Sequence, residues 1–287
     1  MGCMEKERRF MGVSANVALV DETGKIPAAD LSRVAAALSK QVANDFAPIW
    51  GIKATVSAFP NLASVPTGYR PVIIQDRLDE PSALGYHTDK NGQPYSLVMF
   101  TDSYSLTCSH ELLEMLADPL GNNLVTSRPV ARHEHNVQYL VEVCDPCEDA
   151  NFAYTIDGVL VSDFYTPAYF QAHRALGTKY DFTGHIEHPR QVLRRGYLSW
   201  LNLDNNHIEQ EVYFGIQPEI RDLGDASQRG NMSLREFVDS KTEHPGIDTG
   251  LPTDHPVLME AVEKWKANDE AAKKAAERLR QELADLG

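Results

Sequence analysis

The chain has few cysteines, no long apolar run and a deficit of positive charge. Four cysteines among 287 residues are too few for the disulfide framework that holds many small secreted domains together. No stretch approaches the roughly 20 apolar residues that cross a bilayer, and residues 1–10 are charged without a following signal-peptide core. Lys6 stands where a myristoylation signal requires serine or threonine. We therefore expect a soluble cytoplasmic protein with no membrane association.

Acidic residues dominate the charge of the chain. It carries 27 lysines and arginines against 41 aspartates and glutamates, a formal net charge of -14. That charge repels nucleic acid and anionic membranes unless a local basic patch overrides it, and the basic group at Arg190, Arg194 and Arg195 is small. We therefore expect no nucleic-acid partner.

Composition divides the chain into three parts. Residues 1–12 read as an N-terminal tail, residues 13–212 as one folded catalytic domain, and residues 213–287 as a linker and a charged C-terminal helix. This helix is predicted over 256–286, and its thin apolar stripe consists of Leu258, Val262, Trp265, Leu279 and Leu283. We expect the stripe to pack on the protein's own core, with binding to a protein partner as the alternative.

Strand and helix signals are interspersed along the first 162 residues. Helices are predicted from Pro27 to a break at Pro48, where apolar residues recur every three or four positions, and over 106–117. The last two predicted strands form a hairpin around Asp157 and Gly158. The predicted strands lie at 13–20, 52–59, 72–75, 96–100, 138–144, 152–156 and 159–162. This order predicts an α+β fold.

The helix predicted over 106–117 carries the residues that matter most for function. His110 and Glu114 are four positions apart, so they project side by side and can hold one metal ion. Glu111 flanks the same face and can reach a water bound to that metal. The pattern is the metalloprotease helix His-Glu-x-x-His with glutamate in place of the second histidine.

Further carboxylates accompany this helix. Asp118 follows its end, and Glu142 and Asp145 lie on or after the strand predicted over 138–144. A largely buried helix does not carry several uncompensated carboxylates, because buried charge is costly. A metal ion is the simplest compensation, and paired side chains without a metal are the alternative.

Four segments resemble a group of bacterial zincin-like metallopeptidases. They are Gly85–His87, Ser109–Pro119, Tyr139–Pro146 and Val161–Phe170, and the resemblance spans about residues 13–200. It implies a mixed β-sheet above an active-site helix, with an edge strand that pairs with an extended peptide substrate. The segment Leu84–Met99, which contains the turn Asn91–Gly92, would be that edge; an ordinary hairpin is the alternative.

The resemblance also implies a zinc ion held by the helix and a later acidic residue. His110 and Glu114 would be two ligands. Glu142 is the favoured third ligand because strand alternation places it inward, with Asp145 and then Asp118 as alternates. Asp118 is better suited to orienting His110.

The same resemblance implies a peptidase mechanism. Glu111 would act as general base, taking a proton from the attacking water and delivering it to the leaving amine. The candidates for an oxyanion or substrate contact are Tyr197, Tyr165 and His87, each with a packed or surface side chain as the alternative.

Other arrangements of these residues stay open. The fold could serve as a non-catalytic binding or structural module whose carboxylates form a salt-bridge network. Cys144 and Cys147 are ordinary thiols, half of a metal site or a redox pair, and a structural zinc site could draw on Cys108, His110, Cys144 and Cys147. The pairs His133/His135 and His185/His188 have metal-like spacing, but their polar surroundings favour surface loops.

Overall fold

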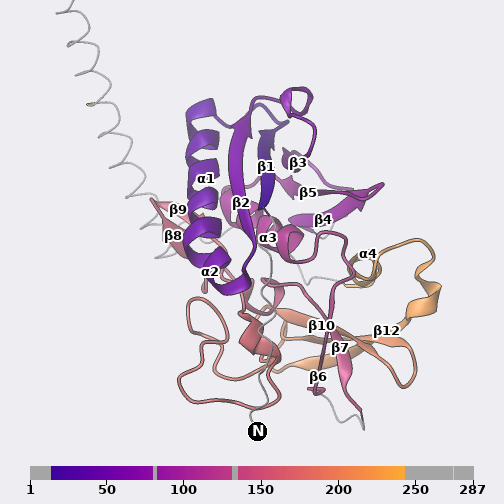
Figure 1. Cartoon of the computed structure of the whole chain (residues 1–287). Coiled ribbons are helices and arrows are strands. Elements are labelled where there is room, and N and C mark those ends of the chain that lie inside the picture. The colour runs from indigo at the N-terminus through magenta and orange to yellow at the C-terminus, as the bar shows by residue number, and fades with distance from the viewer. Residues whose placement is uncertain (1–13, 80–82, 131–134, 243–273, 275–287) are drawn as a thin grey trace, which may run out of the picture.

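The computed structural model describes residues 14–79, 83–130, 135–242 and 274. These residues form a mixed α+β fold, as the sequence predicts, with two five-stranded sheets and a two-stranded hairpin (Figure 1). The tail at 1–12 and the helix predicted over 256–286 lie outside the described residues, apart from residue 274.

The first sheet is mixed and has an antiparallel edge strand. Its strands are, in spatial order, β2 (Lys53–Phe59), β1 (Ser14–Asp21), β3 (Tyr69–Gln75), β5 (Gln93–Met99) and β4 (Gly85–Lys90). Every neighbouring pair is parallel except β4 and β5. The predicted turn at Asn91–Gly92 is confirmed: it joins β4 and β5 in a hairpin, and β4 is an edge strand of the sheet. Both turn residues have the positive φ that a tight hairpin requires, 55° and 79°.

The first predicted helix continues beyond its expected end. Helix α1 (Ala28–Lys40) runs through a π-helical segment (Gln41–Phe46) into α2 (Ala47–Trp50). The predicted break at Pro48 is wrong because this proline lies in the first turn of α2, where its missing N–H is not needed. The helix ends instead at Gly51, whose φ is +72°.

The second sheet is antiparallel and lies below α3 (Tyr104–Ala117) in Figure 1. Its strands are, in spatial order, β12 (Glu219–Asp225), β11 (His207–Val212), β10 (Tyr197–Asn202), β7 (Val137–Leu140) and β6 (Leu124–Ser127). The boundary proposed at 212/213 falls between two paired strands, because β12 pairs with β11. The packed structure therefore continues past that boundary.

The predicted strand 138–144 is correct only in its first half. Strand β7 ends at Leu140, and one further bond of the β6–β7 register follows before the backbone N–H groups turn to another partner. The N–H of Val141 donates to the carbonyl oxygen of Asn123, and the N–H of Cys144 donates to the Glu114 carboxylate. Glu142 therefore lies on an irregular segment, not on a strand.

The remaining elements are short. The predicted hairpin around Asp157–Gly158 is confirmed as β8 (Tyr154–Ile156) and β9 (Val159–Val161). Helix α4 (Leu234–Asp239) begins at a capping box formed by Ser233 and Glu236. The 3₁₀ turns are Leu62–Ser64, Asp145–Cys147, Pro167–Phe170 and Ala226–Arg229.

The main core lies between the first sheet, α1 and α3, and continues into the loops after β7 and β9. Helix α3 is buried along nearly its whole length and packs on β5, β4 and β9. No helix among the described residues has both the length and the apolar character to cross a membrane.

Candidate metal centre

Helix α3 brings three ionisable side chains into the protein interior. Apolar residues such as Leu112 and Leu113 fix the helix between the sheet and the loops, and both are fully buried. Glu111 and Glu114 are only 3% and 0% exposed, while the His110 side chain is 11% exposed. His110 is therefore the member of this group that reaches the surface.

His110, Glu114 and Asp145 form a compact group. His110 Nε2 lies 3.3 Å from Glu114 Oε2 and 3.3 Å from Asp145 Oδ1. A tetrahedral zinc ion with ligands at about 2.0–2.1 Å separates its ligand atoms by about 3.3 Å. The two contacts thus have the spacing of ligands around one ion, and one potential ligand atom from each of the three residues lies within 4.8 Å of the others.

Local structure holds Asp145 in this place. Glu114 Oε1 accepts hydrogen bonds from the backbone N–H groups of Cys144, at 3.0 Å, and Asp145, at 3.3 Å. On the other side of the turn, a Cβ atom at Gly196 would come within 2.6 Å of the Asp145 carbonyl oxygen. Glycine is therefore needed at 196 for β10 to approach, and Glu114 keeps Oε2 free to face His110.

Glu142, the favoured third ligand, lies in a second group with His87 and Glu114. Its Oε2 atom is 3.8 Å from His87 Nε2 and 3.5 Å from Arg235 Nη1. The structure thus brings the alternate, Asp145, next to His110. The alternation argument for Glu142 fails because the chain leaves strand geometry after Leu140.

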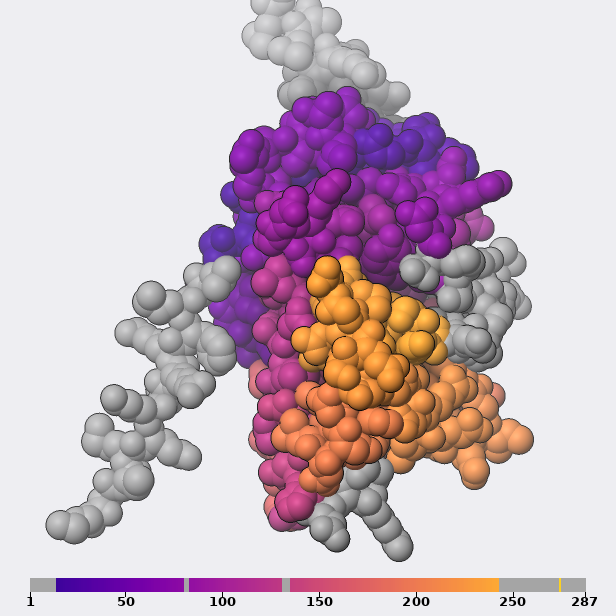
Figure 2. Space-filling view, turned by 90° about the vertical axis from the view of Figure 1, so that its right-hand side faces the viewer, coloured from indigo at the N-terminus to yellow at the C-terminus, as the bar shows by residue number. Residues whose placement is uncertain are grey.

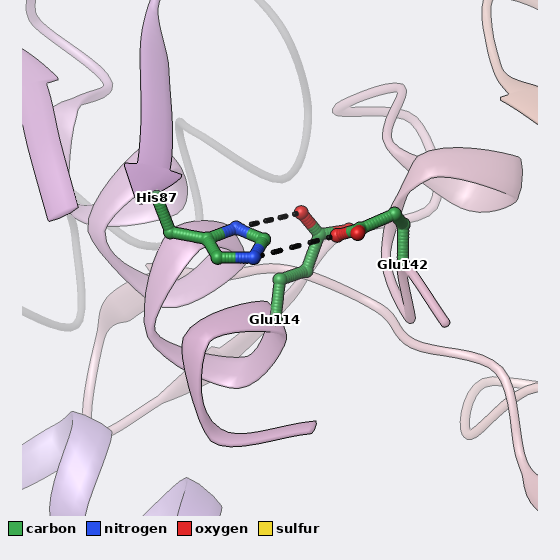
Figure 3. A group of neighbouring side chains, drawn as sticks. All are labelled: His87, Glu114 and Glu142. Carbon is green, nitrogen blue, oxygen red and sulfur yellow. Dashed lines mark ion pairs between the residues drawn. The ribbon is translucent and has the colours of Figure 1, made fainter. Parts of the chain in front are cut away.

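Each ring nitrogen of His87 faces one carboxylate, that of Glu114 or that of Glu142 (Figure 3). Nδ1 lies 3.8 Å from Glu114 Oε2 and 3.7 Å from Glu111 Oε2, whereas Nε2 faces Glu142. One potential ligand atom each from His87, Glu114 and Glu142 lies within 4.8 Å of the others, so this group also has the spacing of a metal site. His87 Nε2 also lies 3.0 Å from the carbonyl oxygen of Asp118.

The Asp118 carboxylate shapes the turn after α3. It accepts hydrogen bonds from the backbone N–H groups of Asn122, at 3.0 Å, and Asn123, at 2.9 Å. These bonds use both carboxylate oxygens. Asp118 thus contacts His87 through its backbone, and its described bonds do not orient His110.

Arg235 is the residue of the site that sequence reasoning missed. Its guanidinium donates to Asp145 Oδ2 at 2.6 Å and pairs with Asp239 at 3.1 Å. The same group lies 3.8 Å from Glu114 Oε2. Figure 2 shows the yellow-orange segment that contains α4 between the purple upper part and the orange lower sheet. The capping box around Ser233 can be read from the sequence, but nothing local indicates that Arg235 points into an acidic interior.

Burial and neighbouring charges shift the pKa values of the ionisable groups in different directions. Burial raises the pKa of Glu142 well above its usual value, and the neighbouring charge of Glu114 adds to the effect even though Arg235 opposes it. Burial lowers the pKa of His110, but Glu114 and Asp145 outweigh it and hold that pKa well above the ordinary value. Burial would raise the pKa of Glu114, yet His110 and Arg235 lower it.

Several buried polar atoms of the site have no hydrogen-bond partner. They are His87 Nδ1, Glu111 Oε2, Glu114 Oε2, both carboxylate oxygens of Glu142 and Asp145 Oδ1. Native proteins satisfy most buried polar atoms, so this cluster of unpartnered atoms has room in its hydrogen-bonding capacity for a cation or for water molecules.

The chain was compared with family models, curated proteins and solved structures. None of them matches. The resemblance to zincin-like metallopeptidases therefore stays a prediction.

Two of the candidate oxyanion contacts, Tyr165 and Tyr197, are buried near the carboxylates. The Tyr165 hydroxyl has no hydrogen-bond partner, and burial, followed by the charges of Glu142 and other groups, raises its pKa well above the usual value. Burial also raises the pKa of Tyr197, whose strongest charged neighbour is Arg235. Tyr165 is therefore a candidate contact whose buried hydroxyl has no hydrogen-bond partner among the described residues.

The structural zinc site that would use the cysteines is not assembled. Cys108, Cys144 and Cys147 are free and buried, and no metal-like group among the described residues includes a thiol. Burial raises the pKa of each thiol, which disfavours the thiolate that metals and redox chemistry need.

In neither of the other two histidine pairs do the described residues place both histidines in one metal-like group. His135 is exposed and contacts Asp204, whereas its predicted partner His133 lies outside the described residues. His188 is exposed, as a surface loop predicts, but His185 lies near two buried carboxylates.

Proposed function

We propose that the protein is a zinc-dependent hydrolase of amide bonds, a metallopeptidase, with His110, Glu114 and Asp145 as the metal ligands. The observation that supports it is the 3.3 Å spacing of His110 Nε2 from both Glu114 Oε2 and Asp145 Oδ1. The residues fit a divalent cation because Glu114 Oε2 and Asp145 Oδ1 are buried and have no hydrogen-bond donor. When bound, zinc would activate water and polarise the scissile carbonyl.

Glu111 is the proposed general base. It follows His110 on α3, and its Oε2 atom is buried and has no hydrogen-bond partner. A carboxylate in this place can take the proton of the attacking water and hand it to the leaving amine. His87 Nδ1 lies 3.7 Å from Glu111 Oε2. When Nδ1 carries a proton, it can donate a hydrogen bond to the substrate oxygen on which negative charge develops.

Strand β4 is the proposed support for the substrate. It is an edge of the first sheet, with β5 on one side only. At Gly85 its backbone runs so close to Glu111 that a Cβ atom would lie 2.8 Å from Glu111 Oε1. An extended peptide that paired with this edge would therefore pass next to the base.

Access to the centre requires movement of its cover. Glu114 and Asp145 are 0% and 2% exposed, and the Arg235 side chain from α4 packs on them. We propose that a substrate approaches past His110 and displaces α4. The hydrogen bond from Thr88 to Glu236, at 2.7 Å, links α4 to β4 and would open in that movement.

The test combines metal analysis with turnover. Zinc content is measured by elemental analysis in the wild-type chain and in Asp145→Asn, and hydrolysis is followed on casein and on a mixed peptide library. We expect the variant to bind one zinc ion per chain fewer than the wild type and to lose all zinc-dependent hydrolysis. A wild-type chain that folds but takes up no zinc at this centre would overturn the proposal.

A second candidate function is supported by Arg235. Its guanidinium already compensates part of the acidic charge, as a salt-bridge network in a non-catalytic module would require. In that case zinc does not bind at His110, and Arg235→Met destabilises the fold whether or not zinc is present. The hydrolase proposal instead predicts that zinc restores part of the stability.

A further inference from the structure

A second pair of buried carboxylates belongs to a group that shares no residue with the metal centre. Asp163 follows β9, and Asp181 forms an antiparallel bridge with Tyr165. The same pairing continues where the N–H of Phe182 donates to the carbonyl oxygen of Phe164, at 2.9 Å. This register brings the two aspartates together, and both are 0% exposed.

The two carboxylates lack a compensating charge. Asp163 accepts hydrogen bonds from the backbone N–H groups of Phe164 and Thr183, and from the Thr183 hydroxyl at 2.6 Å. Asp181 Oδ2 accepts from the N–H of His185, at 2.8 Å, but Asp181 Oδ1 has no partner although it is fully buried. Among the residues that the structure describes, neither aspartate forms an ion pair.

We propose that Asp163, Asp181 and His185 hold a second divalent cation. One potential ligand atom from each residue lies within 4.8 Å of the others. Asp181 Oδ1 is buried and accepts no hydrogen bond, so its lone pairs are available to a cation. Two carboxylates and one imidazole suit a cation that accepts both oxygen and nitrogen ligands, such as Zn²⁺ or Mn²⁺.

The hydrogen bonds around Thr183 prepare His185 for this role. The Thr183 Oγ1 atom lies 2.6 Å from both Asp163 Oδ2 and His185 Nδ1. A hydroxyl has one proton, and the carboxylate oxygen can only accept it. When Asp163 is ionised, as metal binding requires, the Nδ1–H of His185 donates to the hydroxyl, which leaves Nε2 of the neutral ring as the lone-pair nitrogen.

His185 also provides the path for the ion. It is exposed, whereas both aspartates are buried, so the site opens to solvent through this residue. Its ring packs on Phe152 with the ring centroids 5.0 Å apart, which limits where it can lie. The ion would fasten the loop around residue 183 to the segment that follows β9.

The inference does not depend on the proposed hydrolase, because the two sites share no residue. The experiment counts bound metal in the full-length chain, stripped with chelator and dialysed against Zn²⁺ or, separately, Mn²⁺. We expect two equivalents in the wild type, one in Asp181→Asn, one in His110→Ala and none in the double variant. His185→Ala should weaken binding of the second equivalent at least tenfold, and His188→Ala, an exposed histidine nearby, should not.

The outcomes separate the two proposals. If the wild type lacks only the equivalent of metal that depends on His110, the hydrolase proposal fails and the second site stands. If Asp181→Asn binds as much metal as the wild type, or if folded His110→Ala binds none, the second site is overturned. His185 is on the surface, so its variant stays informative if Asp181→Asn does not fold, and unchanged affinity in His185→Ala would also overturn the site.

Discussion

Arg235 Nη1 lies 2.6 Å from Asp145 Oδ2, across 90 positions of sequence. The guanidinium is 4% exposed, so this contact is formed away from solvent. Charge-assisted hydrogen bonds of this kind are strong, and breaking one leaves a buried charge uncompensated. Helix α4 thereby becomes part of the candidate centre, although it belongs to a segment that the sequence assigns to a linker.

Replacing Arg235 with Met should destabilise the metal-free protein by about 3–5 kcal/mol, because several buried carboxylates lose their cation. Arg235→Lys should lose less stability, because lysine keeps the positive charge. It should still lose some, because lysine lacks the forked geometry of the guanidinium. Urea unfolding in EDTA measures the effect, with exposed Arg174→Met as the matched control. An Arg235→Met midpoint equal to that of the control would show that the contact contributes little.

Asp145 and Glu142 can be distinguished as metal ligands. Asp145→Asn should weaken zinc binding about 100-fold or more, because it removes a charged atom next to His110 Nε2. Glu142→Gln should weaken it by no more than about tenfold, as a neighbour that tunes the site. Competition with a fluorescent chelator measures both affinities. The reverse order would restore Glu142 as the third ligand.

The difference between these two residues shows what the sequence can predict. The helix at 106–117, the turn at Asn91–Gly92 and the strands β1, β2, β3 and β5 follow from local periodicity and turn residues, which act over a few positions. Of the second sheet, only β7 is predicted, and only in part. The exit of the chain from β7 depends instead on Glu114 capturing the N–H of Cys144, a contact across 30 positions. Local patterns carry no information about such a bond.

The same reasoning explains why Arg235 is not predicted and why His87 is only one of three candidate contacts in the sequence. His87 lies on an edge strand, where an exposed side chain is as common as a buried one, and its burial depends on α3 packing beneath it. Arg235 lies on a six-residue helix whose position is set by contacts with Gly121 and Asn122. Both depend on tertiary packing.

The stability of the metal-free protein should fall as pH rises from about 5 to 9. The pKa of Glu142 is raised in the folded state, so its contribution is complete below the unfolded value of 4.5 and is lost as pH increases. The pKa of His110 is also raised, so its contribution is complete below 6.5 and is lost above it. Urea midpoints in EDTA across this range measure the loss, and Glu142→Gln should have a shallower slope than the wild type.

Glu111→Gln should retain zinc and fold but lose hydrolysis by a factor of about 10²–10⁴, the usual contribution of a general base. The amide keeps the shape of the side chain and cannot take a proton. Zinc content and turnover are measured on the same sample, with the exposed Glu187→Gln as the matched control. Full turnover in Glu111→Gln would transfer the role of base to another group.

The contact between β4 and the candidate base can be tested at a glycine. Gly85→Ala would place a methyl group 2.7 Å from Thr107 Cγ2 and 2.8 Å from Glu111 Cγ. Because both neighbours belong to a helix buried on several sides, the strand and helix must separate, and the protein should lose about 1–3 kcal/mol of stability. Gly215→Ala is the matched control, since nothing lies within 4 Å of its added atom.

We also expect lower hydrolytic activity in Gly85→Ala at temperatures where the chain is still folded, because Glu111 is displaced. Equal stability and activity in the two variants would mean that β4 does not fix the position of Glu111.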